Sequence, residues 1–175
     1  MKRWILALIS IAMLLGLTAC VFAPEGNDPE IPEGNDPEIS VPEETYDLVV
    51  SNLVLHYLED LDGIYRRIYR TLKPGGVFLF NIEHPTFTAG VNQQFAADGT
   101  WPVTDYYYPG ERITDFLGHE VKKYHHTLTQ ILNGLLKIGF VIEAVEEAMP
   151  PEQWRDQMPE EMKRPMMLLV RARKG

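Results

Sequence analysis

The sequence predicts an α/β domain in which helices cover a largely parallel sheet, and three features of one segment lead to this fold class. Leu48–Val50 and Val77–Phe80 are uninterrupted apolar runs, as expected of strands buried on both faces of a sheet. Between them, apolar residues recur at helical spacing from Leu61 to Leu72. A strand, a helix and a second strand in this order form a βαβ unit, the building block of parallel sheets.

The predicted helix has both a start and a stop signal. Asp60 or Asp62 can cap its first turn, and Pro74-Gly75-Gly76 is expected to end it and to turn the chain into the second strand. The stretch Thr86–Tyr124 that follows this strand is rich in aromatic and polar residues and shows no clear period. We therefore expect it to form a lid or insertion over the carboxyl edge of the sheet.

One helix and two further strands are predicted near the C-terminus. Thr127–Gln130 has the spacing of a capping box and opens a helix that Gly139 ends. Phe140–Glu147 carries three glutamates, which suits an outer strand, and Met166–Val170 is an apolar strand.

The four expected strands leave one edge of the sheet without protection. The glutamate-bearing strand can form one edge, whereas strand 47–53 would form the other with a single charge, Asp47. The apolar character of this strand indicates that further strands are missing beside it. An apolar edge with unpaired N–H and C=O groups is a template for pairing, so we expect self-association through strand 47–53.

Residues 1–19 are expected to be an export signal and not part of the fold. Two basic residues precede the uncharged run Trp4–Leu17, which is shorter than the ~20 residues that span a bilayer. Leu17-Thr18-Ala19-Cys20 resembles the lipobox of bacterial lipoproteins, which implies lipidation of Cys20 and anchoring to a membrane. The alternative is an apolar tail with a coincidental cysteine.

Residues 20–45 are expected to form an extended acidic tether. The octad PEGNDPEI occurs twice, at Pro24–Ile31 and Pro32–Ile39, and no Lys or Arg lies between Val21 and Thr45. Frequent proline and like charges both oppose folding. A calcium-binding repeat is the alternative, but nothing in the pattern makes the carboxylates converge.

The charge of the chain argues against nucleic acid as a partner. The formal net charge is −9 and no basic patch occurs. Cys20 is the only cysteine, so an intramolecular disulfide is excluded.

From Tyr46 to the C-terminus the chain resembles a known enzyme family. DLVVSNLVLHYLED and LKPGGVFLFNIEHP resemble the fourth and fifth strands of class I S-adenosylmethionine-dependent methyltransferases, while FLGHEVKKYHHTL and RPMMLLVRARK resemble a bacterial small-molecule branch. The resemblance implies a partial Rossmann-like sheet of order 4-5-7-6 with the last strand antiparallel. It makes residues 46–175 the C-terminal half of such a domain, with S-adenosylmethionine as cofactor and a small molecule as methyl acceptor.

The chain departs from this family in its cofactor motif. The glycine-rich turn after the family's first strand is absent, since only Gly16, Gly26 and Gly34 precede Tyr46. The family's cofactor contacts that remain are Ser51, Asn52, Leu53 and His56. We therefore expect little activity from the chain alone. The family predicts a cytoplasmic protein, whereas the signal predicts a membrane-anchored lipoprotein.

Candidate catalytic residues stand at the tip of the second strand. Glu83 and His84 could each accept a proton from an acceptor, although His84 could instead satisfy a backbone group before Pro85. We expect substrate contacts from four residues of the insertion: Tyr106, His119, Tyr124 and His125. A metal site among these histidines is the alternative, but adjacent histidines point in different directions, so no metal is expected.

Two functions of different class remain open. The chain is either a methyltransferase whose missing strands come from another chain, or a membrane-anchored lipoprotein domain without catalytic activity that binds a partner.

Overall fold

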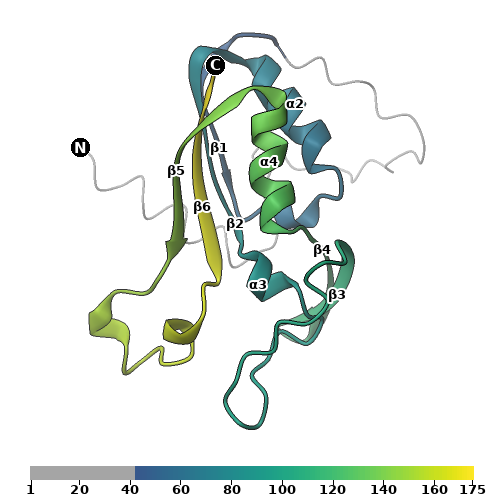
Figure 1. Cartoon of the computed structure of the whole chain (residues 1–175), viewed down its shortest axis with the longest axis vertical. Helices are drawn as coiled ribbons and strands as arrows, with labels where there is room; N and C mark the ends of the chain where they lie inside the picture. Colours follow the sequence, from purple (N-terminus) through teal and green to yellow (C-terminus); the bar gives the residue numbers. More distant parts are fainter. Residues whose placement is uncertain (1–41) are drawn as a thin grey trace, which may run out of the picture. The chain divides into compact units, whose positions relative to one another are not determined.

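The computed structural model describes residues 42–175 (Figure 1). The predictions for the signal 1–19, for lipidation of Cys20 and for the octad repeat lie outside the described residues. Residues 42–175 lie within one compact unit. No helix of the described part is long and apolar enough to cross a membrane.

A four-stranded mixed sheet forms the centre of this unit. Its strands lie in the order β1-β2-β6-β5, with the bounds Tyr46–Asn52 for β1, Leu72–Glu83 for β2, Phe140–Ala148 for β5 and Met167–Lys174 for β6. β1 and β2 are parallel, and β6 is antiparallel to both of its neighbours. The order 4-5-7-6 expected from the family resemblance is thus confirmed, and the glutamate-bearing strand β5 is an edge.

Helices α2 (Leu61–Thr71) and α4 (Leu128–Ile138) pack side by side on one face of the sheet (Figure 1). Each begins where the sequence predicts. The side chain of Asp60 accepts from the N–H of Gly63, and Thr127 and Gln130 form the expected capping box. The core beneath the helices is apolar and fully buried, and its largest members are Tyr65, Phe78, Phe80, Ile131, Leu135, Leu168 and Val170. This core fixes the helices on the sheet.

The predicted stop at Pro74-Gly75-Gly76 is wrong. α2 ends at Thr71, and the next residue, Leu72, is already extended and pairs with Tyr46. Between Leu72 and Val77 the second strand advances five residues while β1 advances only two, so residues 73–76 form a bulge. Gly75 allows this bulge because its φ is +77°. The same glycines that suit a helix end therefore serve inside a strand.

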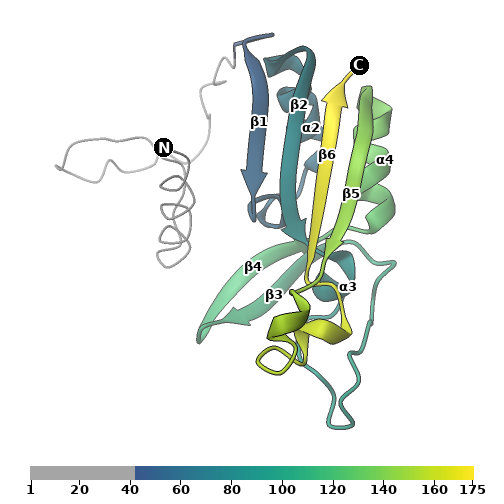
Figure 2. The same cartoon turned by 90° about the vertical axis from the view of Figure 1, so that its left-hand side faces the viewer.

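The expectation that Leu48–Val50 is buried on both faces is also wrong. Leu48 and Val50 are 53% and 58% exposed. Figure 2 shows the reason: α2 and α4 lie behind the sheet, and no element of residues 42–175 crosses the face toward the viewer. We call this the open face.

The stretch Thr86–Tyr124 contains regular structure that the sequence did not predict. After the short helix α3 (Pro85–Thr88), strands β3 (Gly110–Phe116) and β4 (His119–His125) form an antiparallel hairpin. The hairpin lies beyond the carboxyl ends of β1 and β2 (Figure 2). The hairpin reverses the usual burial of apolar side chains and exposure of polar ones, because Ile113 and Phe116 are exposed while Thr114 and Lys123 are buried. Hydrophobic alternation therefore gave no strand signal.

The remaining elements are three short 3-10 helices: η1 (Leu55–Tyr57), η2 (Glu152–Trp154) and η3 (Glu161–Lys163). η1 follows the end of β1 directly and brings His56 beneath the hairpin. The last two lie between β5 and β6.

Candidate functional site

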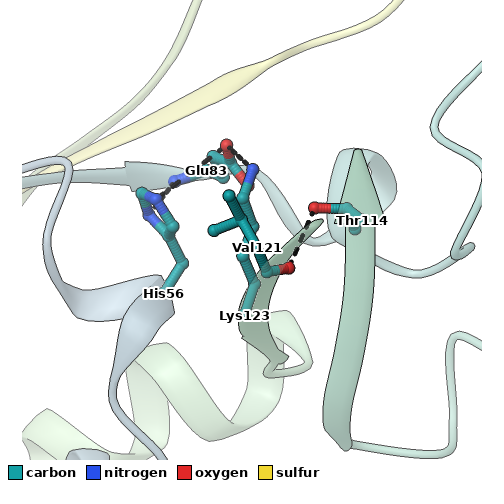
Figure 3. A network of polar contacts seen from close by, with 5 residues as sticks. All are labelled: His56, Glu83, Thr114, Val121 and Lys123. Carbon is teal, nitrogen blue, oxygen red and sulfur yellow. Dashed lines mark hydrogen bonds and ion pairs between the residues drawn. The ribbon is translucent and has the colours of Figure 1, made fainter. Parts of the chain in front are cut away.

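The carboxyl ends of β1 and β2 bring together polar side chains from four elements. β1 ends at Asn52, β2 ends at Glu83, η1 supplies His56 and β4 supplies Lys123. Figure 3 shows His56 and Lys123 on either side of Glu83. Carboxyl ends of parallel strands meet at one edge of a sheet, which is where ligands of open α/β folds bind.

Glu83 and Lys123 form a buried ion pair at this edge. Nζ of Lys123 donates to Oε1 of Glu83 over 2.7 Å, and their side chains are only 3% and 11% exposed, the lysine being the more buried. Burial raises the pKa of Glu83, while the hydrogen bond and the charge of Lys123 act against this rise. Oε2 of Glu83 is buried and has no partner among the described residues. One carboxylate oxygen is thus held and the other is free to accept a proton.

His56 holds the backbone of Glu83 and is uncharged. Its Nδ1 accepts from the N–H of Glu83 over 3.4 Å, so the ring hydrogen is on Nε2, which lies 3.9 Å from Oε1 of Glu83. Burial first, and then the charges of Lys123 and His126, lowers the pKa of His56 to about 3. Next to it, burial and then the charge of Glu83 raise the pKa of Tyr57, which therefore keeps its proton.

The structure brings the expected cofactor residues to the same edge. Leu53 has a left-handed φ of +55° and its N–H donates to the carbonyl of Asn81, so the chain turns here toward His56. Oδ1 of the exposed Asn52 accepts from Nδ2 of Asn81 over 3.2 Å, and Ser51 is half-buried. Ser51, Asn52, Leu53 and His56 therefore line one end of β1.

His84 is not paired with Glu83. Successive residues of a strand point in opposite directions, and Nδ1 of His84 instead accepts from the N–H of Thr86 over 3.1 Å, which caps α3. Its Nε2 lies 2.8 Å from Oε1 of Glu147 on β5, a contact poorly aligned for a hydrogen bond. Burial lowers the pKa of His84, and Glu147 opposes this effect. The geometry thus gives His84 the alternative role, satisfying the backbone next to Pro85.

The four expected substrate residues do not form one group. His125 is fully buried: its Nε2 donates to the carbonyl of Tyr106 over 2.9 Å and its Nδ1 accepts from the hydroxyl of Thr88 over 2.8 Å. Burial lowers the pKa of His125. The hydroxyl of Tyr106 in turn accepts a hydrogen bond from the N–H of Leu128. Tyr106 and His125 thus lie together as part of the packing between the insertion and α4.

His119 and Tyr124 lie apart from this pair. His119 begins β4, six residues before His125, and is exposed, so about 20 Å of strand separates them. Tyr124 is half-buried and stands opposite Glu111 in the hairpin. His126 donates to the carbonyl of Leu58. Among residues 42–175, no three His, Cys, Asp or Glu side chains stand close enough to hold a metal ion.

Sequence reasoning missed Lys123, which is the partner of Glu83 and lies 40 residues further along the chain. A lysine between Lys122 and Tyr124 gives no signal of burial. Only the inward direction of alternate residues in β4, shared with Val121 and His125, could have indicated it, and the strand itself was not predicted.

Comparisons with known proteins agree with this fold. A family model described as a methyltransferase domain matches residues 21–80 and so begins within the segment expected to be a tether. A candidate S-adenosylmethionine dependent methyltransferase from Listeria monocytogenes is 40% identical, with a TM-score of 0.73 over 79% of this chain and 65% of the other. An S-adenosylmethionine dependent methyltransferase from Mesorhizobium loti is also 40% identical, with a TM-score of 0.71 over 78% and 65%.

A longer but more distant relative is an uncharacterized protein of Haemophilus influenzae, 28% identical over 77% of this chain and 56% of its own length. The chain thus covers 56% of the length of the Haemophilus protein and 65% of each of the two methyltransferases.

The mixed sheet and the polar carboxyl edge define a Rossmann-like domain of the type that binds ligands at its strand ends. The family model and the two structures at 40% identity show that this chain is similar to S-adenosylmethionine-dependent methyltransferases. S-adenosylmethionine is the cofactor of that family, as expected from the sequence.

Proposed function

We propose that the chain descends from a methyltransferase acting on a small molecule and retains the acceptor side of its active site. The observation that carries this proposal is the buried Glu83, with Oε1 held by Lys123 and Oε2 without a partner, beside the end of β1. An unpartnered buried carboxylate oxygen is costly unless a ligand uses it.

S-adenosylmethionine, when bound, would supply a methyl group on a sulfonium. Residues 42–175 would orient the acceptor and take its proton. Oε2 of Glu83 could receive the proton that the acceptor gives up, while Lys123 keeps Oε1 in place. Because burial raises the pKa of Glu83, its carboxylate is a stronger base than an exposed one. Ser51, Asn52 and Leu53 would contact the cofactor.

The described residues fit only part of this cofactor. β1 corresponds to the family's fourth strand, and no strand of residues 42–175 corresponds to those that carry the family's glycine-rich turn and ribose carboxylate. We therefore expect residues 42–175 to contribute too few contacts for useful affinity. On this proposal, activity requires a glycine-rich strand from another chain.

Calorimetry with S-adenosylmethionine tests this part of the proposal on the full chain. The expected dissociation constant is weaker than about 1 mM, equivalent to about −4 kcal/mol. Adding the part of the Mesorhizobium loti methyltransferase that this chain does not cover, as a separate chain, should then tighten binding. A dissociation constant near 10 μM for the chain alone would contradict the proposal.

A second candidate function is a membrane-anchored domain without catalytic activity. The exposure of Leu48 and Val50 on the open face favours it, because apolar patches often mark interaction sites. The anchor would be the lipid on Cys20. Labelled palmitate should enter the wild-type chain and not the Cys20→Ala variant, which should also keep its signal. Equal labelling of both chains would exclude this anchor.

A further inference from the structure

The free edge of β1 has a backbone arrangement suited to pairing. The N–H of Leu53 donates to Asn81 on β2, and in a parallel ladder the bonded residues alternate. Val49 and Ser51 therefore also turn their backbone groups to β2. Leu48, Val50 and Asn52 turn theirs to the edge, where no strand of residues 42–175 pairs with them.

The side chains along this edge are apolar on both faces of the sheet. Leu48 and Val50 are exposed on the open face. On the helix-covered face, Val49, Ile64 and Ile68 line a groove of about 450 Å³ between β1 and α2. The one charge of the strand, Asp47, is neutralised by Lys73, whose Nζ lies 2.8 Å away. The edge therefore presents apolar surface with little to repel a partner.

We propose that two copies of the chain associate through β1, antiparallel and centred on Val49, so that their sheets become continuous. In this register Leu48 stands opposite Val50 of the second copy, and both residues turn their N–H and C=O groups to the edge. The two positions thus form hydrogen-bonded pairs. Val49 faces its own counterpart at the two-fold axis and closes the groove beside α2.

The charges are compatible with this register. Asp47 stands opposite Ser51 of the second copy, and the two Asp47 side chains are four residues apart along the strands. That separation is about 13 Å, which exceeds the screening length of about 8 Å at physiological salt. A two-fold contact of this kind is closed, so it predicts a dimer and not a fibre.

The other available occupant is the segment 1–41 of the same chain, whose octad repeat suits the edge poorly. Proline recurs within the octad and has no N–H to donate to a strand. The repeat is also acidic and mostly polar, whereas the groove is lined mainly by apolar side chains with Arg67 as its one charge. The second copy offers the same apolar strand that needs a partner.

Disulfide cross-linking of the full chain in mild detergent tests this register. In a Cys20→Ser background, Val49→Cys places two cysteines at a non-hydrogen-bonded pair, with Cα atoms about 4.5 Å apart and within disulfide reach. Val141→Cys, on the opposite edge strand and 45% exposed, is the matched control. We expect dimer formation at Val49→Cys to be on the order of tenfold faster than at Val141→Cys.

A second substitution separates dimerisation from loss of folding. Leu48→Lys should abolish the cross-link at Val49→Cys while circular dichroism stays unchanged, because position 48 is exposed in the monomer. Val141→Lys should leave the cross-link intact. Equal cross-linking at Val49→Cys and Val141→Cys would overturn the proposal. Cross-linking that appears only after deletion of residues 2–41 would overturn it too, and would assign the edge to that segment.

Discussion

Lys122 and Lys123 are neighbours on β4, and each lies 2.7 Å from a glutamate, yet their surroundings differ completely. Lys122 and its partner Glu111 are 55% and 48% exposed, whereas Lys123 and Glu83 are 3% and 11% exposed. Water screens the first pair, and removing one member leaves the other solvated. Loss of one member of the second pair leaves a charge buried. Distance alone therefore does not indicate which ion pair matters.

The largest effect is expected from Lys123→Met, which keeps the apolar stem and removes the cation. Glu83 then remains buried without its partner, and the free energy of unfolding should fall by about 3–5 kcal/mol at pH 8. Urea denaturation followed by fluorescence measures this loss.

Combining Lys123→Met with Glu83→Gln is the control, since no unpaired carboxylate remains. The double variant should lose less than the single variant. The loss in the single variant should also shrink at pH 5, because burial raises the pKa of Glu83 and favours uptake of a proton. A single variant as stable as Lys122→Met would contradict the contrast between the two pairs.

An intermediate effect is expected from the pH dependence of His56, which lies beside the buried pair. Its pKa is about 3 in the folded chain and 6.5 unfolded, so the folded state disfavours the charged ring. Its stabilising contribution is complete above pH 6.5 and is lost as the pH falls from 6.5 toward 3. Between pH 7.5 and 5.5 the loss is about 1.4 kcal/mol.

The variant His56→Gln isolates this contribution. His84, His125 and His126 also have pKa values lowered by burial and remain in both chains. The free energy of unfolding should therefore be lower at pH 5.5 than at pH 7.5 in both the wild type and His56→Gln. The difference between the two pH values should be smaller in His56→Gln. Equal slopes would show that His56 is accessible to protons in the folded chain.

The smallest effect is expected from Lys122→Met. Both members of its ion pair are about half exposed, so the urea midpoint should not change measurably. Arg171→Gln on β6 should behave in the same way, since Glu143 keeps Arg173 as a second exposed partner. At a higher salt concentration, the urea midpoint of either variant should still equal that of the wild type. A clear shift for Lys122→Met would show that the exposed pair is not screened.

The elements that the sequence predicted correctly have local signals. Asp60 and Thr127 cap the helices whose starts they marked, and Phe140 begins the predicted outer strand. The hairpin β3–β4 was missed because its buried side chains are polar, which reverses the usual alternation. The end of α2 was misplaced because glycine serves a bulge as well as a helix end.

The candidate site was predicted only in part, because some of its contacts depend on the hairpin that the sequence did not predict. Glu83 and the residues at the end of β1 were expected from the family resemblance, and the structure brings them together. His119 was grouped with His125 by nearness in sequence, but an extended strand carries them to opposite ends of the hairpin. His84 was expected to accept a proton at the same site as Glu83 or to satisfy a backbone group, and its bond to the N–H of Thr86 matches the second expectation.

The sequence by itself determined the two long helices and the four strands of the sheet, because capping groups and hydrophobic periodicity act within a few residues. The order of the strands followed from the family resemblance. Only the tertiary structure decided that Lys123 meets Glu83, that His84 caps α3 and that one face of β1 is exposed. These outcomes depend on which distant surfaces exclude water from a side chain. Burial of that kind sets the pKa of Glu83 and of His56, and it is a property of the packed molecule.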